Sequence, residues 1–151
     1  MSEEFLVRDF MSAPATSLSQ NASLLDAVLT FRRTQYRHLP IVDGETLVGI
    51  LSERDVQRVA PSMLTRITQE EYNDIFQNTP IKRVMTPNPL VITPTTPLRD
   101  AAALMNGNKV GCLPVVEGGR LVGILTVIDV LAVLVRVLSG GIAQKSSAQS
   151  R

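Results

Sequence analysis

The chain contains nearly the same ten residues twice, LVGILSERDV from Leu47 and LVGILTVIDV from Leu121. A shift of about 74 residues aligns the two copies, and the register then holds without a gap over most of the chain. Because both copies must adopt the same order of elements, this repeat constrains the fold more than any other feature. The matched pairs include Met11 with Met85, Leu24 with Leu98, Asp26 with Asp100, Leu39 with Leu113, Gly44 with Gly118 and Asp55 with Asp129.

Each copy carries the same sequence of structural signals. An extended segment rich in Pro and Thr precedes a short helix, which is entered through Ser23 in one copy and through Thr96-Pro97 in the other, where the hydroxyl is expected to cap the helix. Two strands follow, over residues 38–52 and 112–126, around the turns DGE and EGG. A second helix begins next. Since about 50 residues bury only a small core, we expect an α+β fold in which two β-α-β-β-α repeats pack sheet to sheet as one pseudo-two-fold module.

The repeat divides the chain into four parts. Residues 1–60 form the first repeat, 61–80 a connecting helical segment, 81–138 the second repeat, and 139–151 a small, polar tail that we expect to be disordered. In the connecting segment Thr68 precedes Glu71 by three residues. This is the pattern of a capping box, so it predicts a helix there.

Composition argues against several classes of function. Fifteen basic and fourteen acidic residues leave no broad charge for nucleic acid or an anionic membrane. Asp129 and Arg136 interrupt the longest apolar run, which makes it a poor membrane span, and the N-terminus lacks the features of a secretory signal. Cys112 is the single cysteine, so a cytoplasmic location without a disulfide is expected. With one His and one Cys, the chain offers little for catalysis, a metal or a catalytic cofactor.

The stretches RHLPIVDGETLVGILSERD and GCLPVVEGGRLVGILTVID, each preceded by Met and a Ser or Thr, resemble tandem CBS domains, the pair called a Bateman module. The resemblance covers nearly the whole chain. The insert EEYNDIFQNTPIKRVMTPNP is also similar to stand-alone bacterial CBS-pair proteins of the acetoin-utilisation type. The resemblance implies a non-catalytic module with two clefts for adenine nucleotides between the repeats.

The G-h-x-[ST]-x-x-D motif of that family is matched by GILSERD and GILTVID. Its Asp can accept hydrogen bonds from both ribose hydroxyls, its Ser or Thr lies where a phosphate can meet the start of a helix, and its Gly permits a close backbone approach. The residues implied for the main cleft are Arg37, His38, Leu39, Pro40, Ser52, Arg54, Asp55, Leu90 and Val91. Those implied for a second, weaker cleft are Thr16, Ser17, Cys112, Leu113, Pro114, Thr126 and Asp129.

The two clefts differ in charge. Arg37, His38 and Arg54 could converge on the phosphates of a ligand in the main cleft. Gly111, Cys112 and Ile128 stand at the matching positions of the second copy and carry no positive charge. We therefore expect a phosphorylated ligand to bind mainly at the first copy.

Simpler interpretations of the same residues stay open at this point. Each Ser or Thr of the motif could be an ordinary helix cap, with its Asp as the capping-box partner. The two Leu-Pro pairs could pack in the core rather than against a base. Repetition alone does not separate these alternatives, because duplication copies caps as readily as ligand-binding residues.

The expected function is that of a sensor for AMP, ADP, ATP or another adenosyl compound. Because no enzyme domain is attached, the regulated target would be a separate, unidentified protein. The resemblance also implies a homodimer, for which the apolar helices LLDAVLTF, LRDAAALM and VLAVLVRVL offer faces. The alternative is a structural dimerisation or interaction module with vestigial clefts.

Overall fold

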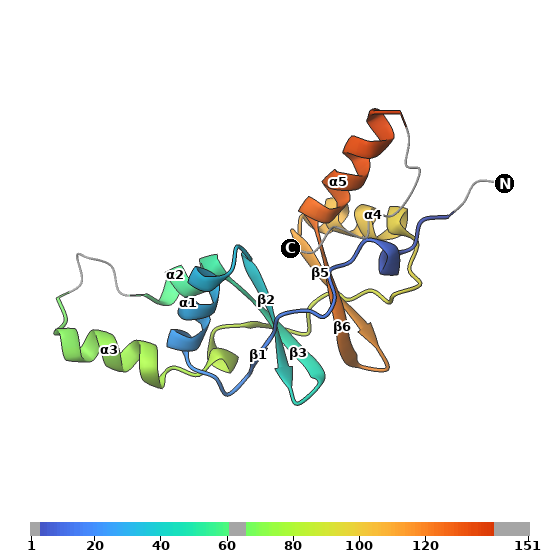
Figure 1. Cartoon of the computed structure of the whole chain (residues 1–151). Helices are drawn as coiled ribbons and strands as arrows, with labels where there is room; N and C mark the ends of the chain where they lie inside the picture. Colours follow the sequence, from blue (N-terminus) through green and yellow to red (C-terminus); the bar gives the residue numbers. More distant parts are fainter. Residues whose placement is uncertain (1–3, 61–65, 141–151) are drawn as a thin grey trace. The chain divides into compact units, whose positions relative to one another are not determined.

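The computed structural model describes residues 4–60 and 66–140 (Figure 1). The order β-α-β-β-α predicted for each repeat is confirmed, as is the helix α3 between the repeats. The predicted tail lies outside the described residues from residue 141 onward. The elements are η1 (Val7–Asp9), β1 (Leu18–Ser19), α1 (Leu24–Arg33), β2 (His38–Asp43), β3 (Thr46–Ser52), α2 (Glu53–Val59), α3 (Gln69–Asn78), η2 (Ile81–Arg83), β4 (Thr86–Pro87), α4 (Leu98–Asn108), β5 (Cys112–Glu117), β6 (Arg120–Thr126) and α5 (Val127–Leu138).

The chain forms two compact units whose boundaries differ from those of the sequence repeats. The first unit is Thr16–Pro89, and the second unit combines Met1–Ala15 with Leu90–Arg151. The segment that begins each sequence repeat therefore packs in the unit that contains the rest of the other repeat. The repeats thus exchange their N-terminal segments.

In the first unit, β1 runs parallel to β2, and β2 and β4 both run antiparallel to β3. Pro87 and Thr86 of β4 lie opposite Gly49 and Ile50 of β3, which ties the start of the second repeat to the first unit. Helices α1 and α2 contribute apolar side chains to one core. Its buried residues are Leu24, Ala27, Leu39, Ile41, Leu51, Val56 and Ile81.

The second unit repeats this plan. The hairpin β5–β6 is joined by bridges from Ser12 to Ile124 and from Ile92 to Val115. Its buried core consists of Val7, Ile92, Leu98, Ala101, Met105, Leu113, Val115, Leu125 and Val133.

The exchanged segments are held in the same way in both units. The Ile81 N–H donates to the carbonyl oxygen of Ala22 at 2.9 Å in the first unit, and the Val7 N–H donates to that of Thr96 at 2.9 Å in the second. Both side chains are fully buried. Since Val7 and Ile81 occupy matching positions of the repeat, the exchange is reciprocal.

The motif glycines make room for these exchanged segments. A Cβ added to Gly49 would lie 2.9 Å from the carbonyl oxygen of Thr86, and one on Gly123 would lie 3.0 Å from that of Ser12. The contact at Gly49 is closer than side chains tolerate and the contact at Gly123 is at that limit, so glycine is favoured where the Met-Ser or Met-Thr segment crosses the strand. The close approach expected at these glycines is thus made by the protein's own backbone.

Most of the expected helix starts are confirmed. Ser23, Ser52, Thr68 and Thr126 each accept a hydrogen bond from the backbone N–H three residues on, and each start is a complete capping box.

The cap expected from Thr96 is wrong. The N-cap of α4 is Pro97, without a side-chain cap, because the Thr96 hydroxyl instead accepts from the Thr93 N–H at 3.0 Å. The Leu98 N–H is satisfied by the carbonyl oxygen of Phe5 at 2.7 Å.

Candidate functional site

Several of the residues predicted for the main cleft meet where β2, β3 and α2 come together in the first unit. His38 at the start of β2 lies opposite Ser52 at the end of β3. The Glu53 N–H, at the start of α2, donates to the carbonyl oxygen of Arg37 at 3.0 Å. The hairpin and the helix start therefore place Arg37, His38 and Ser52 beside one another.

Asp55 completes this group from the first turn of α2. One of its oxygens, Oδ2, accepts from the Ser52 N–H at 2.8 Å, and the Asp55 N–H donates to the Ser52 Oγ at 3.0 Å. The other oxygen, Oδ1, lies 3.5 Å from Nη1 of Arg58. The helix-cap interpretation of Asp55 is thus correct for the free protein. It employs Oδ2, so it does not compete with a ligand role for Oδ1.

Arg58 was missed by the sequence analysis. It follows Asp55 by three residues on α2, so the two side chains lie on the same face of the helix. This spacing is the signal that could have identified it.

Burial lowers the pKa of His38 below its ordinary value of 6.5, and the positive charge of Arg37 acts in the same direction, while the Asp55 carboxylate opposes both. His38 is therefore mainly neutral at neutral pH, and an added negative charge nearby would favour its protonated form. The side chains of Arg37 and Arg54 are exposed.

The remaining residues predicted for the main cleft differ from this polar group. Leu39 is fully buried in the first-unit core, and Pro40 is also fully buried, so their side chains are held in protein packing. Leu90 and Val91 are exposed by 45% and 43% and belong to the second unit. Their participation in a cleft with the first-unit residues stays a prediction.

The second unit contains the same backbone frame with different side chains. Cys112 lies opposite Thr126, and the Val127 N–H donates to the carbonyl oxygen of Gly111 at 3.0 Å. The Thr126 N–H donates to Oδ2 of Asp129 at 2.9 Å. Asp129 is only 6% exposed. The frame is retained, and the cations of the first unit are absent at the matching positions.

Other residues predicted for the second cleft are placed as follows. Leu113 and Pro114 are fully buried, while Thr16 and Ser17 are half-buried and belong to the first unit. Burial raises the pKa of the Cys112 thiol to about 12. The thiol therefore stays protonated at neutral pH and is a poor nucleophile.

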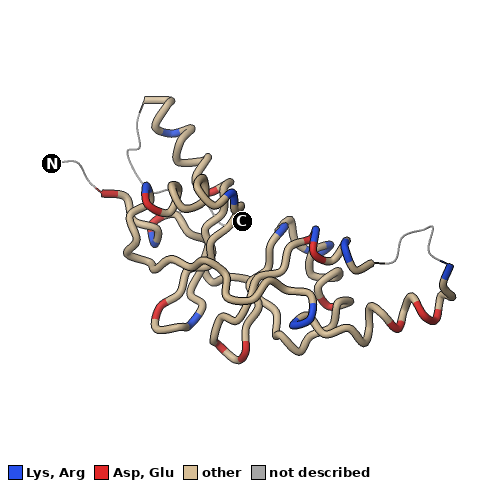
Figure 2. The backbone as a smooth tube through the Cα atoms, turned by 180° about the vertical axis from the view of Figure 1, so that it is seen from behind, with Lys and Arg blue, Asp and Glu red and all other residues tan. Residues whose placement is uncertain are grey.

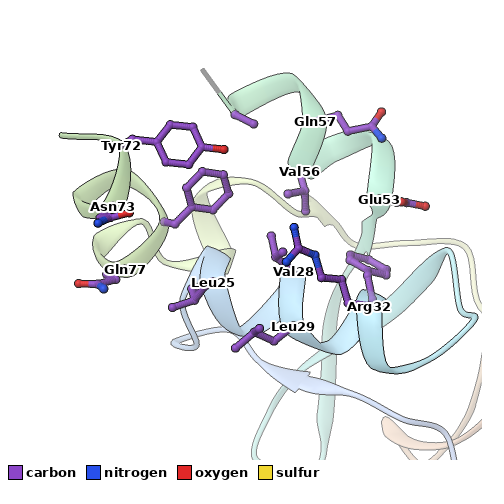
Figure 3. A pocket seen from close by; sticks show the side chains of 13 residues that line it. Leu25, Val28, Leu29, Arg32, Glu53, Val56, Gln57, Tyr72, Asn73 and Gln77 are labelled. Carbon is purple, nitrogen blue, oxygen red and sulfur yellow. The ribbon is translucent and has the colours of Figure 1, made fainter. Parts of the chain in front are cut away.

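A separate groove of about 450 Å³ opens between α1, α2 and α3 in the first unit (Figure 3). Val28, Val56 and Tyr72 point into it from the three helices. No residue predicted for either cleft lines this groove. The groove is therefore distinct from the polar group around Asp55.

Charged residues of both signs are interspersed along the described chain (Figure 2), which agrees with the near-zero net charge. Within residues 4–60 and 66–140, no group of three or more His, Cys, Asp or Glu side chains is placed to hold a metal ion. Among the same residues, no helix combines the length and the apolar character needed to cross a bilayer.

The duplicated β-α-β-β-α unit, with a Ser/Thr-x-x-Asp motif at each strand-to-helix junction, defines a tandem module. The CBS domain profile matches residues 7–62 and 81–136, and the chain therefore belongs to the CBS domain family as a tandem pair. The predicted recognition of this family is confirmed.

Three solved structures are similar over almost their whole length. One is a protein assigned to acetoin utilisation (AcuB) from Vibrio cholerae, with 32% identity, coverage of 91% of this chain and 95% of the other, and a TM-score of 0.76. The second is CBSX2 from Arabidopsis thaliana in complex with AMP, with 29% identity, coverage of 88% and 98%, and a TM-score of 0.76. The third is the CBS domain pair of protein MJ0100 with 5′-methylthioadenosine and S-adenosyl-L-methionine, with 27% identity, coverage of 87% and 97%, and a TM-score of 0.71.

Proposed function

We propose that this protein is a non-catalytic sensor of an adenine nucleotide and that the polar group of the first unit is its principal binding site. The observation that carries the proposal is the convergence of a ribose-type carboxylate, Asp55, with the His38 imidazole and the Arg37 backbone at one strand-to-helix junction. Similar CBS pairs bound to AMP or to 5′-methylthioadenosine support an adenosyl ligand.

In the proposed complex, Asp55 accepts hydrogen bonds from the two ribose hydroxyls. Its Oδ2 is already engaged with the Ser52 N–H, so Oδ1 takes the main part. Arg37 and Arg54 are exposed and always charged, which suits them to bind the phosphate by charge-assisted hydrogen bonds. His38 joins them when it is protonated. Because the Leu39 and Pro40 side chains are buried, the adenine would meet mainly the backbone edge of β2.

The second site binds a phosphorylated ligand more weakly. It retains Asp129, but Gly111, Cys112 and Ile128 replace the three cationic or titratable residues of the first site. Without them, a phosphate would lose its hydration without gaining the charged partners that the first site offers. This site is better suited to a neutral nucleoside or to no ligand.

A separate protein in the cytoplasm would respond to ligand binding. We also infer a homodimer. Helix α5 exposes Leu131, Leu134, Val135 and Leu138, the last by 77%, and such a contiguous apolar stripe favours an interface. Helix α4 is a poorer candidate than the sequence suggested, because Leu98, Ala101 and Met105 are buried in the core. A structural module with vestigial clefts is the alternative.

A thermal-shift panel of AMP, ADP, ATP, S-adenosylmethionine, adenosine and GMP tests this function. A ligand present at about 100 times its dissociation constant stabilises the folded protein by about 2.7 kcal/mol, which is a clear shift in melting temperature. We expect adenine nucleotides to give the largest shifts and GMP to give none. If no adenosyl compound shifts the transition at millimolar concentration, the structural alternative is favoured.

A further inference from the structure

Arg58 forms an ion pair with the Asp55 carboxylate. The Asp55 side chain is only 14% exposed, and its Oδ2 is directed back to the Ser52 N–H. Its Oδ1 lies 3.5 Å from Nη1 of Arg58, whose side chain is 68% exposed. A ribose whose two hydroxyls donate to Asp55 must therefore displace this guanidinium or share Oδ1 with it.

The contact between Arg58 and Asp55 is easily broken. The Arg58 side chain is largely exposed, and an ion pair with such a partner contributes little to stability, because water screens it and the long side chain loses conformational freedom. A separation of 3.5 Å is also longer than the 2.7–2.9 Å typical of a strong charged hydrogen bond. Arg58 is thus a displaceable partner of the carboxylate rather than a fixed support.

We propose that Arg58 determines the ligand specificity of the first site: it leaves Asp55 when the ribose binds and moves to the 5′-phosphate of the same ligand. The site then selects a nucleotide over an adenosyl compound with an uncharged 5′ group. This inference rests on the proposed function, since it assigns a specificity to the same site.

The selectivity follows from what each ligand offers the displaced side chain. AMP and 5′-methylthioadenosine share adenine and ribose and differ in the 5′ substituent. The ribose of either ligand displaces Arg58 from the Asp55 carboxylate, but only AMP has a phosphate that offers Arg58 a new negative partner. Guanidinium and phosphate match in a bidentate geometry, so the exchange favours the nucleotide.

The second unit provides an internal comparison. Ala132 stands at the position that matches Arg58, although the capping box of Thr126 and Asp129 is retained. Alanine carries no charge, so it cannot pair first with the Asp129 carboxylate and then with a phosphate. The inference therefore predicts phosphate selectivity for the first site alone.

The test is calorimetric titration of the full chain with AMP and, separately, with 5′-methylthioadenosine. In Arg58→Gln, the affinity for AMP divided by the affinity for 5′-methylthioadenosine should fall at least about fivefold, because AMP loses a charge-assisted partner. Binding of 5′-methylthioadenosine should be unchanged or up to about threefold tighter, since the competing ion pair is gone. Arg58→Lys keeps the positive charge but loses the bidentate guanidinium. Its affinity ratio should lie between that of the parent and that of Arg58→Gln.

Arg33→Gln is the matched control, because it removes one exposed positive charge at the end of α1 and is not among the residues predicted for either cleft. It should preserve the affinity ratio, and all variants should melt as the parent does. Equal losses for both ligands in Arg58→Gln would indicate a merely structural role and would overturn the inference, as would an unchanged ratio. If the parent binds neither ligand, the proposed function itself fails. If the parent binds AMP and Arg58→Gln has the same affinity ratio as the parent, the proposed function stands but the role proposed for Arg58 is wrong.

Discussion

Ile81 tests the reciprocal exchange of segments most sharply, because it belongs to the second sequence repeat and packs in the first unit. Its side chain is fully buried among Leu24, Leu39 and other core residues. Replacing a buried Ile by Ala removes apolar contacts and leaves a cavity, which costs about 2–5 kcal/mol of folding stability. With an m-value of about 1–3 kcal/mol per molar urea, we expect the unfolding midpoint of the first unit to fall by about 1–2 M.

Tyrosine fluorescence can report this unit selectively. The chain has no Trp, and its two tyrosines, Tyr36 and Tyr72, both lie in the first unit. Urea unfolding of Ile81→Ala should therefore show the full loss by tyrosine fluorescence. Val59→Ala is the control, because Val59 lies in the same unit but is 41% exposed, and it should shift the midpoint far less. If Ile81→Ala left the tyrosine transition in place, the segment would not pack in the first unit, and the exchange would be wrong.

Three other expectations can be checked independently. A chain cut near Gln77 should give fragments that aggregate or melt without cooperativity, because each loses an exchanged segment; two soluble fragments with sharp calorimetric transitions would contradict this. Light scattering should give the mass of a dimer for the parent and of a monomer for Leu134→Asp, whereas a parent mass near one chain at every concentration would exclude the α5 interface. The third concerns His38. Because burial lowers its folded pKa below the unfolded value of 6.5, the unfolded chain binds more protons, so stability should decline as pH falls through 6.5. Chemical unfolding between pH 7.5 and 5.5 should show a smaller decline for His38→Gln, and identical declines would remove His38 as the cause.

The order of elements could be predicted because local signals repeat in both copies. The hairpin turns need residues at positive φ, and Gly44 and Gly118 supply them in the two copies. The capping boxes can be recognised within four consecutive residues, so two of the three starts expected outright to carry a cap, at Ser23 and Thr68, were predicted correctly. The exception, Thr96, failed because Thr93 offers its hydroxyl a nearer donor.

The exchange of segments could not be predicted, because the two repeats carry matching residues at the positions where the exchanged segments make contact. Met11 and Met85 occupy matching positions of the repeat, as do Gly49 and Gly123. The local sequence therefore does not show which methionine packs against which glycine. Only the tertiary fold pairs Met85 with Gly49 and Met11 with Gly123.

At the site, the motif identified Asp55 and Ser52, but it did not show which carboxylate oxygen of Asp55 accepts from the Ser52 N–H. The tertiary structure assigns this bond to Oδ2, and Oδ1 is the oxygen that can accept from a ligand. The sequence likewise offered Leu39 and Leu113 as base contacts, although a Leu-Pro pair in a strand has no signal that separates core from ligand. Both leucines are in fact fully buried in their cores.

The central claim is that the first unit holds the dominant nucleotide site and that Asp55 is its ribose acceptor. Calorimetric titration of AMP into the parent, Asp55→Asn and Asp129→Asn tests it most directly, since Asn keeps an oxygen for the capping amide and removes the charge. Hydrogen bonds to a charged group contribute about 1.5–3 kcal/mol each, so Asp55→Asn should weaken AMP binding at least about tenfold, and Asp129→Asn should cost less. Circular dichroism should confirm that both variants are folded. Equal losses, or a greater loss for Asp129→Asn, would contradict the account.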